Sequence, residues 1–252
     1  NKYFGPRANA SMAIANQLST QTQTLTVAMV GAFQPAITAA CGAKNYEWMR
    51  TMAFRACKFG TLIVLAFAIP LAVEVDEVLR LWLKTPPPYT AGLCLCMLGV
   101  LVIDKSSIGH MVAVNANGKV AAYQAFLGTA LVFTLPIAWA FVELGMGIMS
   151  VGYGFLVATA LSAWGRVYFA RRLVGMSARR WLRDVAFPLL LLIIVASSAG
   201  AVVRFSMPPS LFRVFATTVA VEIVLLPAAW CLIMAPDERQ YVVEHVARRL
   251  RR

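Results

Sequence analysis

The sequence predicts an all-α protein, a polytopic transmembrane helical bundle of about seven helices. Two observations lead to this class. Of the 252 residues, 60% are hydrophobic and only 13% are charged, whereas soluble domains carry about 45–50% and about 25%. The mean hydropathy is +0.71, and the apolar residues gather in long blocks of the length that a bilayer-spanning helix needs, roughly 20 residues.

The apolar blocks are too long and too uniformly apolar to be barrel strands. Because lipid offers the backbone no hydrogen bonds, only helices and closed barrels cross it, so we expect helices. The expected spans are 8–40, 59–73, 89–114, 120–142, 148–169, 185–203 and 214–234. Prolines lie within or near the edges of several, and we interpret them as packing kinks or as hinges; they are Pro70, Pro136, Pro188 and Pro227.

Charge placement predicts how the chain crosses the membrane. The net charge of +12 would suggest nucleic acid in a soluble protein, but here the bases lie between apolar blocks, so we expect no nucleic-acid partner. The more basic connections are predicted to be cytoplasmic by the positive-inside rule, which places the N-terminus outside and the C-terminus inside. That basic set contains Lys44, Arg50, Arg55, Lys58, Lys119, Arg166, Arg171, Arg172, Arg179, Arg180, Arg183, Arg239, Arg248, Arg249, Arg251 and Arg252.

Several features argue against other protein classes. The cysteines are odd in number and scattered, so we expect neither a metal site nor a disulfide framework. No zinc-protease, serine-hydrolase or Walker A motif occurs, so we predict no enzyme and no cofactor. The chain begins with Asn1 and no signal peptide is visible, which suggests a piece cut from something longer.

Two short segments are amphipathic. Residues 74–84 are predicted to lie on the outer interface, and residues 237–252 form a basic stretch suited to the anionic cytoplasmic leaflet.

The first expected span carries the clearest functional signal. Its polar side chains recur at helical spacing and include more amides than a lipid-exposed helix tolerates. These side chains either form hydrogen bonds between helices or line a hydrated substrate path. The candidate cavity residues are Asn9, Asn16, Gln17, Thr20 and Gln23; Gln34 lies on the same face, which Gln17, Gln21 and Thr24 broaden.

The third expected span contains ionisable residues at membrane depth, where they usually face a cavity or a partner. Three interpretations are open. The residues form a structural ion pair, they act as an ion relay or substrate contact, or they lie at a shallow helix end. The residues are Asp104, Lys105, Ser107, His110 and Asn115.

Three further charged positions invite an interpretation. Arg55 and Lys58 precede the second span and either anchor it or bind an anionic head group. Glu222, near the middle of the last span, is predicted to pair with Arg213 or to face another helix.

An ordered set of short motifs resembles the C-terminal part of bacterial lipopolysaccharide or O-antigen flippases, in the multidrug/oligosaccharidyl-lipid/polysaccharide exporter superfamily. The similarity runs from Asn1 to about Leu182, and the last two helices match by position only. The motifs are Tyr3-Phe4-Gly5-Pro6, Ile14-Ala15-Asn16-Gln17, Gln34-Pro35-Ala36-Ile37, Lys58-Phe59, Ile69-Pro70-Leu71, Leu79-Arg80-Leu81-Trp82-Leu83-Lys84, Pro88-Tyr89, Ile103-Asp104, Asn117-Gly118-Lys119, Tyr123-Gln124, Leu135-Pro136 and Leu173-Val174-Gly175-Met176-Ser177.

This resemblance implies a two-lobed fold that moves an oligosaccharide on undecaprenyl pyrophosphate from the inner to the outer leaflet by alternating access. It implies that residues 1–182 are five spans of one lobe, that 183–236 are two additional helices and that 237–252 are a cytoplasmic tail. The expected partners are the lipid-linked oligosaccharide, membrane lipids and a missing N-terminal lobe; the expected location is the bacterial inner membrane. Met12 stands where many relatives have Arg, and Lys105 also departs from them. A multidrug exporter of the same superfamily, or a membrane enzyme acting on lipid or glycan, are the alternatives.

Overall fold

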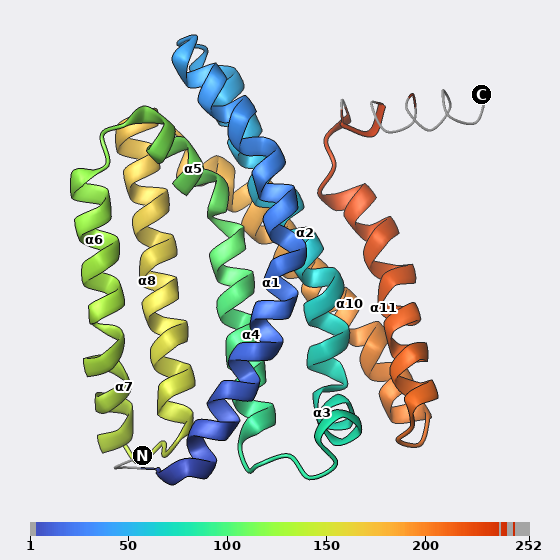
Figure 1. Cartoon of the computed structure of the whole chain (residues 1–252). Helices are drawn as coiled ribbons and strands as arrows, with labels where there is room; N and C mark the ends of the chain where they lie inside the picture. The colour runs from blue at the N-terminus through green and yellow to red at the C-terminus, as the bar shows by residue number, and fades with distance from the viewer. Residues whose placement is uncertain (1–3, 237, 241–243, 245–252) are drawn as a thin grey trace.

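The structure is a computed structural model that describes residues 4–236, 238–240 and 244. Its described residues form a bundle of helices joined by short connections, which confirms the predicted all-α class (Figure 1). The helices are α1 (Gly5–Gly42), α2 (Tyr46–Val73), α3 (Val75–Leu83), α4 (Thr90–Ser106), α5 (Ile108–Asn117), α6 (Ala121–Val132), α7 (Thr134–Glu143), α8 (Met149–Val174), α9 (Ala178–Trp181), the π-helical turn η1 (Leu182–Ala186), α10 (Phe187–Ser206) and α11 (Leu211–Leu232).

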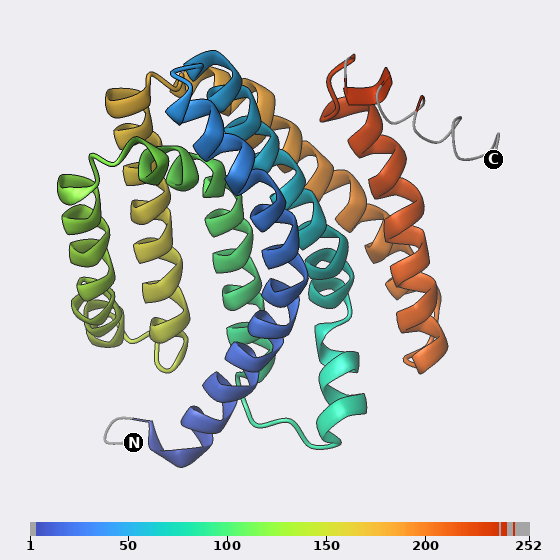
Figure 2. The ribbon, with the colours of Figure 1, turned by 45° about the horizontal axis from the view of Figure 1, so that its top comes forward.

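The bundle is organised around α2 and α4. Helix α1 runs obliquely across one face and packs against α2, α4 and α5, while α8 packs between α4 and the α6–α7 pair (Figures 1 and 2). The α10–α11 hairpin packs on α2, on the side away from α6 (Figure 1). The predicted boundary at 182–183 falls inside a continuous helical stretch, Ala178–Ser206.

Four helical stretches among the described residues are long and apolar enough to cross a membrane, and the number rises to six if two bent pairs each count as one span. The four are Tyr46–Val73, Ala121–Glu143, Ala178–Ser206 and Leu211–Leu232. The bent pairs are the two parts of α1, Gly5–Thr24 and Thr26–Gly42, and the α4–α5 pair; each bends by 45°. The remaining predicted span corresponds to α8, which is 26 residues long but does not meet the same criterion.

Two expected spans are interrupted by a turn: 120–142 remains one membrane-length stretch, Ala121–Glu143, whereas 89–114 is bent by 45°. The block 120–142 divides at Phe133 into α6 and α7. Pro136 explains this break, because its ring nitrogen has no hydrogen to donate to the Val132 carbonyl four residues earlier. The block 89–114 divides at Ser107, for reasons that belong to the site described below.

The charged connections sort to two ends of the bundle, as the sequence predicts. One end holds the start of α1, helix α3 and the α7–α8 and α10–α11 connections; the other holds the α1–α2, α5–α6 and α8–α9 connections and the end of α11 (Figures 1 and 2). Which end faces the cytoplasm stays a prediction. Several basic residues expected in connections lie within helices: Arg166, Arg171 and Arg172 in α8, and Arg50, Arg55 and Lys58 in α2. Arg166 lies deepest, two turns before the end of α8.

Helix α3 is fixed to α11 by buried charge. Arg213 donates to Glu74 at 2.7 and 3.2 Å, and Thr217 donates to the other Glu74 oxygen at 2.9 Å. Glu74 and Arg213 are both buried, so removing either would leave the charge of the other buried without a partner. Arg213 therefore pairs with Glu74 and not with Glu222, contrary to one expectation from the sequence.

The other end of α11 is also held. Arg55 forms an ion pair with Glu238 at 2.8 Å, and Lys58 donates to the Ile233 carbonyl at 3.1 Å. The rest of the predicted amphipathic tail, 237 and 241–252 except Glu244, lies outside the described residues.

Candidate functional site

The amide side chains of α1 lie on the surface of the bundle, whereas Ser11, Thr22 and Thr26 of the same helix are buried. Ala15, Leu18 and Ile37 are buried on the opposite face of the same helix, against α2 and α4. This arrangement turns the amides away from the neighbouring helices, which favours a polar environment outside this bundle over hydrogen bonding within it. The exposed polar residues are Asn9, Asn16, Gln17, Thr20, Gln21, Gln23, Thr24 and Gln34, hereafter the amide face.

The break between α4 and α5 frees backbone groups that side chains from other helices then satisfy. Trp181 Nε1 donates to the Ser106 carbonyl at 2.8 Å, and Arg166 Nη1 donates to the Asp104 carbonyl at 3.1 Å. The Gly109 amide donates to Cys57 Sγ at 3.3 Å. Because an unpaired backbone group in a dry environment is costly, these contacts explain how the helix breaks inside the bundle.

A glycine makes the break compatible with close packing. A Cβ at Gly109 would stand 1.8 Å from the Ala53 carbonyl oxygen, so α5 can approach α2 this closely only with glycine here.

An ion cluster lies beside the break. Asp104 forms ion pairs with Lys105 at 2.9 Å and with Arg166 of α8 at 2.7 Å. The side chains of Lys105 and Arg166 are 6% and 12% exposed, and that of Asp104 is 24% exposed. Arg166 also donates to the Ser107 hydroxyl at 3.3 Å. The cluster thus joins α4 to α8 with one more positive than negative charge.

His110 lies in an aromatic setting next to this cluster. Its ring stands edge-on to Phe54 and Trp181, with centroids 5.8 and 5.9 Å away, and its Nδ1 is 3.5 Å from Cys57 Sγ. The ring is fully buried. This position suits packing between α2, α5 and α9 better than contact with a solute.

The predicted site residues therefore divide into groups. Those of α1 are exposed, while Asp104, Lys105, Ser107 and His110 lie around the break in the interior. Asn115 is exposed near the end of α5. Arg55 and Lys58 contact the end of α11 and Glu238, with Arg55 also 5.8 Å above the Trp48 ring.

Sequence reasoning missed Arg166 and Trp181 as partners of the broken helix. Arg166 stands 62 residues from Asp104 in the chain, so no local spacing links the two. The one available signal was that a buried carboxylate requires a cation, and an arginine at the end of an apolar block offered one.

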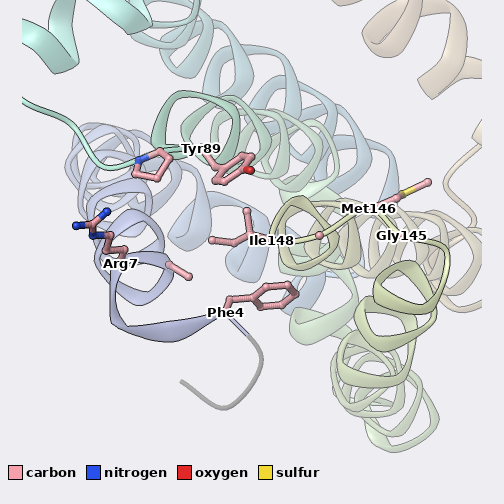
Figure 3. A pocket seen from close by; sticks show the side chains of 9 residues that line it. Phe4, Arg7, Tyr89, Gly145, Met146 and Ile148 are labelled. Atoms are coloured by element: carbon pink, nitrogen blue, oxygen red, sulfur yellow. The ribbon is translucent and has the colours of Figure 1, made fainter.

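An open pocket of about 560 Å³ lies at the end of the bundle where α1 begins. Phe4 and Arg7 of the first turns, Tyr89 before α4 and Ile148 before α8 line it, and its floor is largely apolar (Figure 3). It lies at the opposite end from the α1–α2 connection and shares no lining residue with the ion cluster.

Taken together, these features define a multi-pass α-helical membrane protein with an exposed polar face and a buried ion cluster. Residues 1–92 match the MatE family model, whose members are membrane transporters of the exporter superfamily named above. The match covers 92 of 252 residues, spans α1 to α3 and the start of α4, and so contains the whole amide face. No curated protein and no solved structure gives a match.

Proposed function

We propose that this chain is part of a membrane transporter that flips a lipid-linked oligosaccharide of the undecaprenyl pyrophosphate type from the inner to the outer leaflet. The observation that carries the proposal is the exposed amide face, which lies wholly within the stretch that matches MatE. In this mechanism the face forms one wall of a hydrated path, and a second lobe, a partner of this chain, forms the other.

Contact with lipid is energetically unfavourable for the amide face. Moving an amide from water to a hydrocarbon without a hydrogen bond costs about 4–8 kcal/mol. A threonine avoids much of the cost, as Thr24 does by donating to the Thr20 carbonyl at 3.0 Å. A carboxamide has two N–H donors and an acceptor, which its own helix cannot satisfy in the same way. Asn16, Gln17 and Gln23 therefore favour water, sugar hydroxyls or a polar partner surface.

The ion cluster has a different role in this proposal. Arg166 holds the end of α4 and the break against α8 through Asp104 and Ser107, where the helix bends by 45°. We assign the substrate contacts to the amide face. The ion cluster instead stabilises α4, which packs against α1.

Water access to α1 tests the proposal directly. In the native full-length protein, with Cys231 replaced by Ser, Thr20→Cys is expected to react with a membrane-impermeant maleimide. Ile223→Cys is the matched control, because its side chain is 66% exposed on the apolar surface of α11. Equal, negligible labelling at both positions would show that lipid covers the amide face and would contradict the proposal.

Activity then identifies the cargo. Asn16→Leu and Gln23→Leu are expected to reduce surface polysaccharide in the source bacterium at unchanged protein levels in the membrane. Ala125→Leu, at an exposed position of α6 away from the amide face, is expected to leave it normal. If polysaccharide stays normal in the amide variants and drug resistance falls, the chain belongs to a multidrug exporter.

A membrane enzyme has less support from the geometry. The acids at the end of the bundle near α3 are each paired with an arginine: Glu74 with Arg213, Glu77 with Arg80 and Asp76 with Arg204. Such pairing suits packing between helices rather than acid–base chemistry.

A further inference from the structure

A second hollow lies between α4, α8 and α9, and no residue of α1 lines it. It measures about 560 Å³, within the range of roughly 300–1,000 Å³ typical of small-molecule sites. Residues of α4, α8, α9 and η1 line it, among them Ile103, Trp164, Tyr168 and Trp181. It is thus a largely apolar groove, hereafter the α8–α9 groove.

The rim of the α8–α9 groove opens to the surroundings of the bundle. Trp164, Tyr168 and Leu182 are 60%, 45% and 55% exposed, although all three are apolar or aromatic. Trp164 and Tyr168 stack with ring centroids 5.6 Å apart, and Trp181 is held by its hydrogen bond to the Ser106 carbonyl. Such aromatic side chains are typical of the boundary between acyl chains and head groups.

A second, smaller pocket continues the groove at the basic end of the bundle. It measures about 360 Å³, shares Arg171 and Ala178 with the groove and adds Arg179 and Ser177. Arg171 and Arg179 are exposed, and neither forms an ion pair with a carboxylate in the described part of the chain. The nearby Asp184 is already paired with Arg180 and Arg183.

We infer that the α8–α9 groove and its basic mouth bind one phospholipid with an anionic head group from the surrounding bilayer. The acyl chain occupies the apolar groove beside Trp164 and Trp181, and the phosphate lies between Arg171 and Arg179. The apolar groove and the cationic pocket meet at Arg171, which lines both. Together they match the acyl chain and the phosphate of such a lipid. This site does not include the amide face, so the inference does not rest on the proposed transport activity.

The structure predicts a preference for head-group charge. One arginine close to an anionic lipid increases affinity by about fivefold. The purified full chain, reconstituted in vesicles of phosphatidylcholine with a minor fraction of phosphatidylglycerol, is therefore expected to retain phosphatidylglycerol selectively when native mass spectrometry releases it from detergent. With two arginines at the mouth of the groove, we expect about 25-fold enrichment over phosphatidylcholine.

Matched variants locate the site. Arg171→Gln should remove much of the enrichment, and adding Arg179→Gln should remove most of the rest. Arg172→Gln, which removes one charge as Arg171→Gln does, should retain the enrichment, because Arg172 lies in the same last turn of α8 but lines neither pocket. Ala160→Trp should fill the groove and displace the lipid, and Leu161→Trp, at the neighbouring exposed position, should not. All of these positions are exposed, so folding is expected to be preserved.

Three results would overturn the inference. Equal retention of phosphatidylglycerol and phosphatidylcholine would exclude recognition of the head group. Equal loss in Arg171→Gln and Arg172→Gln would reduce the effect to general attraction of a basic surface for anionic lipid. Undiminished enrichment in Ala160→Trp would exclude the groove as the place of the acyl chain.

Discussion

Asp104 offers the sharpest test of the ion cluster. In Asp104→Asn, Lys105 and Arg166 keep their positive charges in a buried setting but lose the carboxylate between them. Removing one partner of a buried pair typically costs about 3–5 kcal/mol. The Asp104 side chain is 24% exposed, which allows water to screen part of the loss, so we expect the lower end, about 3 kcal/mol.

Thermal unfolding of the purified chain in detergent measures this loss. For a chain of this size, about 1 kcal/mol shifts the midpoint by roughly 2–4 °C, so Asp104→Asn should unfold roughly 6–12 °C earlier. Asp76→Asn is the control: it removes an acid paired with Arg204 at 3.0 Å but 66% exposed, and exposed pairs contribute about 0–1 kcal/mol.

Equal midpoints for Asp104→Asn and Asp76→Asn would refute the reasoning, because the cluster would then behave as a solvated surface pair. The double variant Asp104→Asn/Arg166→Gln adds a second check. It should be less destabilised than the sum of the single variants, since both charges of one pair leave together.

Three other substitutions test the remaining contacts by the same unfolding measurement. Gly109→Ala should destabilise by about 1–3 kcal/mol or more, because its new methyl would stand 1.8 Å from a backbone oxygen of α2. Glu74→Gln should cost about 3–5 kcal/mol by leaving the buried arginine of α11 without a counter-charge. Trp181→Phe should cost about 1 kcal/mol, because a part-buried carbonyl at the α4–α5 break loses its donor.

Each of these variants has a counterpart that should change little. Gly128→Ala enters open space on α6 and should be neutral or slightly stabilising. Glu143→Gln and Trp139→Phe alter exposed side chains at the end and outer surface of α7. If a counterpart destabilises as much as the test variant, the stated contact is not the cause.

The apolar runs predicted the helices that contain few charges. The expected spans 185–203 and 214–234 correspond closely to α10 and α11, because length and apolarity decide where such helices lie. The start of α2 was missed: the helix begins at Tyr46 and not at residue 59, since its first turns carry Arg50, Arg55 and Lys58. Asn45 was the available signal, because its side chain caps the helix by accepting from the Trp48 amide at 3.1 Å.

The candidate site was predictable in its residues but not in its geometry. Helical spacing alone placed Asn16 and Gln23 on one face, and the structure exposes both. Whether Asp104 faced a cavity or a partner depended on Arg166, and a contact between residues so distant in the chain follows only from the packing of α4 on α8. The break at Ser107 likewise depends on donors from other helices, which a single apolar block does not reveal.

The contact between Glu74 and Arg213 also sets an order of events during synthesis. The two residues are 139 positions apart, and a ribosome adds about 5–20 residues per second. Arg213 is therefore synthesised roughly 7–30 s after Glu74. Until then, α3 has no counter-charge from α11, and the end of the bundle near α3 stays incomplete. Helix α11 thus neutralises an acid that was made earlier, at the end of α2.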